Sequence, residues 1–168
     1  DKQRFQIETI VDRLAKKEPI QYIWGETTFC GLSFHVSRDV LIPRPETEQL
    51  IRLIVNDFSS CPSPRILDIG TGSGCIAISL ASLLPASRVT ALDISSSALQ
   101  VAADNATLNH VSVSWTCVDI LSSEAESCLE QYDCIVSNPP YIMEHEQLEM
   151  DASVLDYEPH KALFVPDT

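Results

Sequence analysis

The segment Arg65-Ile66-Leu67-Asp68-Ile69-Gly70-Thr71-Gly72-Ser73-Gly74 joins a short apolar run to a second apolar stretch at 75–84. Glycine at alternate positions lets the backbone turn tightly and approach a ligand, and the N-terminus of a following helix offers free N–H groups. The segment therefore predicts a strand, a glycine-rich turn and a helix. On its own it leaves open whether the turn binds a nucleotide-type cofactor or only connects two elements. Asp68 is expected to order the turn by accepting backbone hydrogen bonds.

The alternation of short apolar runs and helical stretches continues to residue 137. Strands are expected at 65–69, 88–92, 112–118 and 132–137, with helices at 74–84, 95–108 and 122–129. Strands that alternate with helices of 10–15 residues are typical of a parallel sheet with helices on both faces. The predicted fold class is thus α/β, with a doubly wound, mostly parallel sheet.

A different pattern precedes this unit. Expected in order are a helix at 3–17, a β-hairpin within 22–36, an extended bend around two prolines at 41–45, and a helix over 46–58. Trp24 and Trp115 lie in apolar strand patterns and are expected to pack inside the protein.

Three units are expected along the chain. Residues 1–19 form a linker helix, 20–45 the hairpin and bend, and 46–168 the main domain. The last apolar run, 162–165, predicts a fifth strand of the sheet. Because a doubly wound sheet normally has one or two further elements, the chain is expected to be truncated at its C-terminus.

Composition and charge narrow the classes of protein. The chain of 168 residues carries 24 acidic and 11 basic side chains, which gives a net charge of −13. Hydrophobic residues make up 45% of the chain. No apolar run approaches the ~20 residues that span a bilayer. The basic side chains are spread thinly, which argues against a nucleic acid and favours a partner protein with a basic surface. The six cysteines lack C-x-x-C spacing and the four histidines are isolated, so we expect reduced thiols, a cytoplasmic protein and no metal site.

Polar residues close the other predicted strands. Asp93 follows the strand at 88–92, Asp119 follows 112–118, and Asn138 follows 132–137. The carboxyl ends of parallel strands meet at one edge of the sheet, where α/β proteins bind ligands. We therefore expect these three side chains to face the glycine-rich turn.

Asp93 and Asp119 each have two interpretations. A carboxylate about twenty residues after the glycines can accept hydrogen bonds from a ribose diol, with Ile94 packing on an adenine face. Alternatively, Asp93 only caps the next helix, although Ser95 or Ser96 can take that role. Asp119 either accepts a hydrogen bond from an adenine amino group or is a solvated strand end. These residues do not distinguish a methyltransferase from a nicotinamide-dependent enzyme.

The tetrapeptide Asn138-Pro139-Pro140-Tyr141 separates these two classes. It can hold a flat NH2 group, because the Asn138 side-chain oxygen and the Pro139 carbonyl accept its two hydrogens while Tyr141 stacks on its plane. Hydride transfer has no use for such a clamp. The alternative is a proline-rich loop with a stacking tyrosine, which leaves its place at a strand end unexplained. The residues predict an N-methyltransferase that uses S-adenosylmethionine, with Asn138, Pro139 and Tyr141 as catalytic residues and Pro140 in the substrate site.

Several ordered motifs carry a family resemblance. They are Leu41-Ile42-Pro43-Arg44-Pro45-Glu46-Thr47-Glu48, the segments 67–74 and 136–141, and Tyr157-Glu158-Pro159 followed by Ala162-Leu163. The stretch from Gly25-Glu26 to 34–36 adds a hairpin of similar sequence. Together these resemble the release factor glutamine methyltransferases, over nearly all of residues 20–165. The resemblance implies a Rossmann-like, class I methyltransferase fold.

The resemblance also implies a role for each site residue. The methionine moiety of S-adenosylmethionine is expected at Gly70, Thr71, Gly72, Ser73 and Gly74, the ribose at Asp93, and the adenine at Asp119 and Ile120. Asp68, Ile94 and Asn138 complete the expected cofactor site. Residues 138–141 are expected to hold the glutamine of the Gly-Gly-Gln loop in a class I peptide chain release factor, whose methylation modulates translation termination. Many members have an aromatic residue where Ile120 stands, and their N-terminal helical bundle is reduced here to 1–19.

Two other functions remain open on the sequence. An adenine-amino N-methyltransferase acting on DNA or RNA shares the tetrapeptide, but it needs a flipped base and a basic channel, which the acidic balance disfavours. A fragment that binds the cofactor without catalysis is the second alternative. The expected partner is a release factor, with no nucleic acid and no membrane, the expected product of the cofactor is S-adenosylhomocysteine, and the expected state is a monomer.

Overall fold

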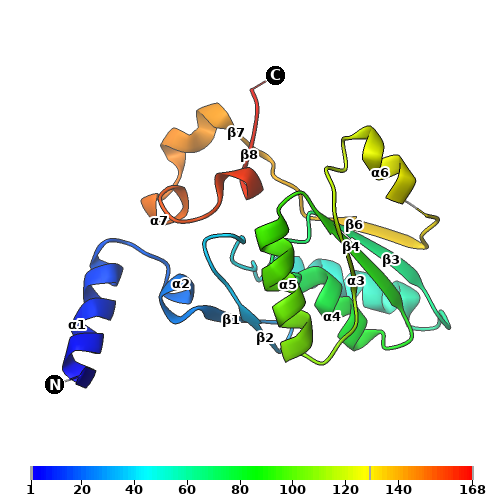
Figure 1. The fold of residues 1–168 in the computed structure, drawn as a ribbon, viewed down its shortest axis with the longest axis horizontal. Helices are drawn as coiled ribbons and strands as arrows, with labels where there is room; N and C mark the ends of the chain where they lie inside the picture. The colour runs from blue at the N-terminus through cyan, green and yellow to red at the C-terminus, as the bar shows by residue number, and fades with distance from the viewer. Residues whose placement is uncertain (1, 129, 168) are drawn as a thin grey trace.

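A four-stranded parallel sheet lies among the helices of the main domain, toward the right of Figure 1. The computed structural model describes residues 2–128 and 130–167, and the strand order of the sheet is β5-β4-β3-β6. The strands are β3 (Arg65–Ile69), β4 (Arg88–Asp93), β5 (Ser114–Cys117) and β6 (Cys134–Ser137). The predicted α/β class with a parallel sheet is confirmed. β5 and β6 are shorter than expected because their pairing with β4 and β3 begins only at Ser114 and Cys134.

The order of the strands reverses beside β3. The chain moves outward from β3 to β4 and β5, then returns to the other side of β3 to form β6. In register, Ile69 at the end of β3 lies between Leu92 of β4 and Ser137 of β6. Open α/β sheets bind ligands outside the carboxyl ends of the strands at such a reversal. The topology therefore fixes where a ligand site can form.

Helices cover the two faces of the sheet unequally. The main core contains residues of α3 (Thr47–Phe58), α4 (Cys75–Leu83) and α5 (Ser96–Leu108), whereas α6 (Ser123–Cys128) packs on the opposite face. β3 shows the division, because Ile66 belongs to the main core while Leu67 packs with Ala125 of α6. On the α6 side, Ile135 of β6 is 64% exposed. The helices predicted at 46–58, 74–84, 95–108 and 122–129 are confirmed to within one residue at each described end, and Leu129 lies outside the described residues. The helix predicted at 3–17 ends two residues earlier, at Ala15.

The N-terminal part contains one element that the sequence analysis missed. It comprises α1 (Lys2–Ala15), α2 (Ile20–Trp24), β1 (Glu26–Phe29) and β2 (Leu32–His35). The hairpin is confirmed, turning at Cys30 and Gly31, which both have positive φ. Residues 20–24 form a helix that ends at Gly25 in the left-handed conformation, so residues 22–24 do not belong to the hairpin as predicted. The burial of Tyr22, whose Oη donates to the Val40 carbonyl at 2.7 Å, favours this helix.

α1 projects from the rest of the molecule at the N-terminal end (Figure 1). Its apolar side chains are largely exposed, with Phe5 at 71% and Ile7 at 62%. Tyr157 secures the segment that follows the helix by donating from its Oη to the Lys16 carbonyl at 2.9 Å. The predicted amphipathic pattern thus forms a helix whose apolar face lies open.

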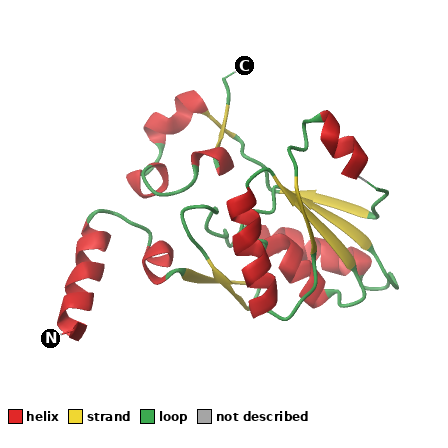
Figure 2. Ribbon diagram, in the orientation of Figure 1, coloured by secondary structure: helices red, strands yellow, loops and turns green. Residues whose placement is uncertain are grey.

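The C-terminal excursion leaves the sheet after β6 and returns beside its own start (Figure 2). It comprises β7 (Ile142–Met143), the 3-10 helix η1 (Glu144–Glu149), α7 (Ala152–Leu155), the 3-10 helix η2 (His160–Ala162) and β8 (Phe164–Val165). The expectation of a fifth strand in the main sheet is wrong. β8 pairs in parallel with β7 in a separate two-stranded sheet, because the excursion brings it back to that position and Pro166 directly follows it.

Gly74 provides a test of how tightly the main core packs. A Cβ at this position would lie 2.9 Å from Ile78 Cδ1 and 3.1 Å from Ala102 Cβ, on a backbone with φ of +80°. We expect Gly74→Ala to lower the free energy of unfolding by about 2–4 kcal/mol, since overpacking adds to backbone strain. Gly31→Ala is the matched control, because Gly31 has φ of +76° but a Cβ there would meet no atom within 4 Å. We expect this variant to lose only ~1 kcal/mol of unfolding free energy. Urea denaturation measures both, and equal losses would contradict the packing explanation.

Candidate functional site

The carboxyl ends of the four strands border a cavity of about 580 Å³. This volume lies in the range of roughly 300–1,000 Å³ found for small-molecule sites. Four strand-end segments line it, at 69–73, 92–95, 118–121 and 137–140. The structure thus brings Asp93, Asp119 and Asn138 to the same cavity as the glycine-rich turn, where the topology of the sheet predicts a site.

Two segments outside the sheet contribute to the lining, together with residues near the N-terminal ends of α3, α4 and α5. Residues 38–41, Pro43 and Arg44 come from the proline-rich bend, and residues 159–162 come from the C-terminal excursion. The sequence analysis assigned no site role to either segment. The available signal was that both lie in motifs carrying the family resemblance, since a motif without predicted secondary structure often lines a site.

The glycine-rich turn leaves open space on the cavity side. Gly70 and Gly72 have φ of +72° and +56°, and a Cβ at either position would meet nothing within 4 Å. The Gly70 and Thr71 N–H groups both donate to the Leu92 carbonyl, at 2.9 and 3.0 Å. These bonds attach the turn to the end of β4. A ligand can therefore approach the backbone of a turn that is already fixed.

Asn105 on α5 holds the turn from behind, and sequence reasoning did not identify it. Its side chain is fully buried, and its Nδ2 donates to the Ser73 carbonyl at 2.9 Å. It also exchanges hydrogen bonds with the backbone of His35, accepting at 2.6 Å and donating at 3.0 Å. One amide thus connects the turn with the hairpin.

Asp68 lies beneath the turn and does not line the cavity. Its Oδ2 accepts hydrogen bonds from Thr71 Oγ1 at 2.6 Å and from the Ala77 N–H at 3.2 Å. Complete burial raises the pKa of this carboxyl to about 7, and the charge of Asp93 adds to the effect while the two hydrogen bonds oppose it. Asp68 therefore orders the turn, as expected, but has no surface on the cavity for direct contact with a cofactor.

Asp93 joins the ends of two strands. Its Oδ2 accepts from the Gly72 N–H at 2.8 Å and its Oδ1 from the Ser95 N–H at 2.9 Å. Ser95 Oγ accepts from the Ala98 N–H and so caps α5. The capping role thus belongs to Ser95, which is the alternative that leaves the Asp93 carboxylate at the cavity. Ile94 beside it lines the cavity and is 58% exposed.

The adenine end of the predicted site is formed by Asp119 and Ile120, which both line the cavity. Asp119 is exposed, and its Oδ1 accepts from the Leu121 N–H at 2.9 Å. Ile120 packs against the small core between the sheet and α6. One face of Ile120 is therefore supported from below while the residue borders the cavity.

The 138–141 loop is tied to β3 at its base. Ser137 Oγ donates to the Ile69 carbonyl at 2.7 Å. Asn138, Pro139 and Pro140 line the cavity, whereas Tyr141 does not and is 76% exposed. Gly74 likewise lies outside the lining, in agreement with its packing contacts.

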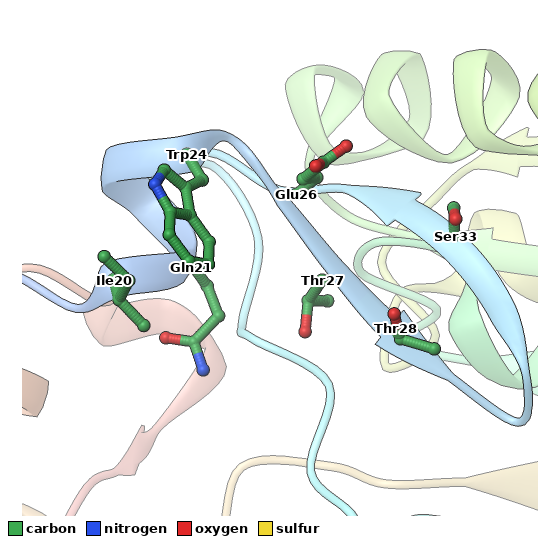
Figure 3. Close-up of a pocket in the computed structure, with 7 residues that line it drawn as sticks. All are labelled: Ile20, Gln21, Trp24, Glu26, Thr27, Thr28 and Ser33. Carbon is green, nitrogen blue, oxygen red and sulfur yellow. The ribbon is translucent and has the colours of Figure 1, made fainter.

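A second cavity of about 320 Å³ lies at the hairpin, away from all predicted site residues. Figure 3 shows its lining, which comprises Ile20, Gln21, Trp24, Glu26, Thr27, Thr28 and Ser33. The prediction that Trp24 packs inside the protein is wrong, because the residue lies on α2 and is 67% exposed. Trp115 does pack against the main core.

Two features are not found in the described ranges. Within residues 2–128 and 130–167, no helix has the length and apolar character needed to cross a membrane. Over the same part of the chain, no three His, Cys, Asp or Glu side chains gather in a way that could hold a metal ion.

The strand order, the open glycine-rich turn and the polar strand ends define an α/β protein with a cavity where the order of the strands reverses. Residues 46–156 match the methyltransferase small domain family, and the chain belongs to that family.

Curated relatives are named release factor glutamine methyltransferase. The protein from Flavobacterium psychrophilum is 50% identical over 168 residues, covering 98% of this chain, and that from Bacteroides thetaiotaomicron is 52% identical over 166 residues, covering 99%. The resemblance drawn from the motifs is thereby confirmed. This chain spans 58% of the length of each of these two relatives.

Solved structures share the fold at lower identity. The SAM dependent methyltransferase from Agrobacterium tumefaciens aligns with a TM-score of 0.57 over 68% of this chain and 39% of its own, at 21% identity. The hMettl16 catalytic domain in complex with MAT2A 3′UTR hairpin 6 aligns with a TM-score of 0.59 over 82% of this chain and 52% of its own, at 20% identity. These likenesses confirm the Rossmann-like methyltransferase fold.

The ionisation of Asp68 leads to a prediction about stability. Because its pKa rises from 3.8 to about 7 on folding, the folded protein binds this proton more tightly than the unfolded chain. The resulting stabilisation is complete below about pH 4, decreases as the pH rises, and is lost above about pH 7. The unfolding free energy of the wild type is therefore expected to fall between about pH 4 and about pH 7. In Asp68→Asn, which lacks this titration, we expect that fall to be smaller by roughly 3 kcal/mol. Urea denaturation across this pH range measures the difference, and an unchanged pH dependence would contradict the raised pKa.

Proposed function

We propose that the protein containing this chain transfers a methyl group from S-adenosylmethionine to the side-chain amide of a glutamine, in the Gly-Gly-Gln motif of class I peptide chain release factors. One observation carries the proposal. Asn138, Pro139 and Pro140 border the same cavity as Gly70 and Gly72, on adjacent strands, in a chain about half identical to proteins of that name.

The cavity suits S-adenosylmethionine. Open space at Gly70 and Gly72 leaves room for the methionine moiety against the turn, and Thr71 and Ser73 belong to the same lining. We assign the ribose to Asp93 and the adenine to Ile94, Asp119 and Ile120, which all line the cavity. When bound, the cofactor supplies an electrophilic methyl group on a sulfonium.

The Asp93 carboxylate has the capacity for this role. Each of its oxygens accepts one backbone N–H and, as a carboxylate oxygen, keeps a further lone pair. Both oxygens can therefore accept from ribose hydroxyls as well. Because the two backbone bonds fix the orientation of the carboxylate beforehand, binding does not need to order it.

The Asn138 loop supplies orientation and electrostatic stabilisation. An amide nitrogen is a weak nucleophile because its lone pair is delocalised into the carbonyl group. The Asn138 side-chain oxygen and the Pro139 carbonyl accept the two amide hydrogens, which directs the nitrogen into the cavity and stabilises the positive charge that develops on it. Pro139 and Pro140 restrict the loop before the substrate arrives. The exposed ring of Tyr141 packs on the amide plane of the bound glutamine.

The charge of the chain fits a protein substrate. A net charge of −13 attracts a partner with a basic surface and repels phosphate backbones. We assign the enzyme to the cytoplasm as a monomer. The competing candidate is an adenine-amino N-methyltransferase, which uses the same tetrapeptide on a flipped base.

A methylation assay on the full-length protein separates the two candidates. Labelled cofactor is supplied with a release factor in one arm and with DNA or RNA in the other. We expect label in the release factor, and mass spectrometry should place one added methyl group on the glutamine of its Gly-Gly-Gln motif. Label in nucleic acid alone would contradict the proposal.

Asn138 provides the sharpest test of the clamp. Asn138→Ala removes one preorganised acceptor, so we expect kcat to fall by ~100-fold or more, equivalent to about 3 kcal/mol of transition-state stabilisation. Binding of S-adenosylhomocysteine, measured by calorimetry, should remain. Asn56→Ala is a matched control, because Asn56 lies exposed on α3 outside the cavity. Near-normal turnover in Asn138→Ala would contradict the clamp.

Asp93 provides a separate test of the cofactor site. In Asp93→Asn one oxygen remains, and the new NH2 group faces one of the two backbone N–H donors. We expect the dissociation constant for S-adenosylhomocysteine to rise by about 10-fold or more. The control is Asp104→Asn on α5, where the carboxylate is exposed and outside the lining. Unchanged affinity in Asp93→Asn would place the ribose elsewhere.

A further inference from the structure

Two walls of different construction enclose the main cavity. The sheet wall is formed by the carboxyl ends of the four strands, and the backbone hydrogen bonds between these strands hold it in place. The covering wall is formed by the bend at 38–44 and by the strap, which we define as residues 157–162 of the C-terminal excursion and of which 159–162 line the cavity. Neither segment belongs to the sheet. The contacts between bend and strap therefore determine the shape of the cavity opposite the strand ends.

Glu158 makes the principal contact between bend and strap. Only 2% of its side chain is exposed. Its Oε1 accepts from Arg44 Nη2 at 2.6 Å, and its Oε2 accepts from the Ile42 N–H at 3.4 Å. A buried carboxylate is tolerated only when it is paired and hydrogen-bonded. Here the one carboxylate holds both a side chain and the backbone of the bend.

The neighbouring residue docks the strap on the same segment. Tyr157 packs against the small core that includes Val40 and Ile42 of the bend. The Arg38 guanidinium stacks over the Tyr157 ring, 4.8 Å from its centroid. Arg38 and Arg44 both line the cavity, so Tyr157 and Glu158 between them position the two arginines of the covering wall.

The strap is also connected to the Asn138 loop. β8 begins one residue after the strap and pairs with β7, which begins immediately after Tyr141. The Ile142 N–H donates to the carbonyl of the buried Leu163 at 3.1 Å. A shift of the strap is therefore transmitted to the loop that borders the cavity.

We propose that Glu158 is a positioning residue for methyl transfer. Through Arg44 and Ile42 it fixes the covering wall, and through β8 and β7 it fixes the Asn138 loop over the cavity, without touching the reacting atoms. The proposal rests on the proposed function. Because the sheet wall does not depend on Glu158, loss of its charge disturbs the orientation of the amide more than the binding of the cofactor.

The test uses Glu158→Gln in the full-length enzyme. Glutamine keeps the volume of the side chain, but its NH2 group must face one of the two donors. We expect kcat to fall by roughly 10- to 100-fold, the effect of a small misplacement of reacting groups. Affinity for S-adenosylhomocysteine should stay within about threefold, since the change acts on the chemical step. If this variant does not fold, Arg44→Lys keeps the charge but loses the planar guanidinium and allows the same comparison.

A double-mutant cycle distinguishes positioning from general destabilisation. If Glu158 acts through Arg44, the variant Arg44→Met/Glu158→Gln should lose no more turnover than the worse single variant. Leu84→Ala is the control, because Leu84 is buried in the main core outside the lining. Assayed well below its melting temperature, this control should keep kcat within about twofold of the wild type.

Each result bears on a defined part of the proposal. A kcat for Glu158→Gln within about twofold of the wild type, or independent and additive losses in the cycle, would overturn the positioning role alone. The same assay also tests the proposed function. Methylation of the release factor by the wild type, and its loss in Asn138→Ala, would support that function. An inactive wild type that still binds S-adenosylhomocysteine would contradict that function and the positioning role with it.

Discussion

The parallel pairing of β3 with β6 is the constraint on which the rest of the site depends. It places Ser137 beside Ile69, and the hydroxyl of Ser137 donates to the carbonyl of that residue. Two segments separated by more than sixty residues of sequence therefore leave the sheet at neighbouring points. The glycine-rich turn and the Asn138 loop face one cavity because of backbone geometry, before any side chain contributes. A site assembled in this way tolerates change elsewhere provided that this register is kept.

Buried polar groups then give the strand ends a fixed shape. Asp68 and Asp93 each hold two hydrogen bonds to the turn or its surroundings, and Asn105 secures the turn to the hairpin. The two carboxylates have different environments: Asp68 is fully buried and its pKa is raised, whereas Asp93 remains at the edge of the cavity. Burial thus assigns one carboxylate to structure and leaves the other accessible to a ligand.

Periodicity and strand-end position predicted the sheet and most of the cavity, because both depend on local patterns that parallel pairing brings together. Long-range contacts produced the differences. Tyr22 and its neighbours form a helix since that places the ring in a core with Val40, and β8 pairs with β7 since the excursion returns there. Asn105 and Glu158 also escaped prediction. Their partners lie 70 and more than 100 residues away, and no local pattern records such a distance.

The two walls of the cavity come from different parts of the fold. The sheet wall belongs to the part of the fold that recurs in solved structures at about one-fifth identity, so it accounts for what those proteins have in common. A shared fold does not fix the substrate. The segments outside the sheet here are the hairpin, the bend and the excursion, and of these the bend and the excursion line the cavity. The ion pair of Arg44 and Glu158 joins the bend to the strap. Both segments carry motifs of the family resemblance. Under the proposed function, a motif that covers the cavity while leaving the sheet untouched is what substrate selection on a common cofactor site requires.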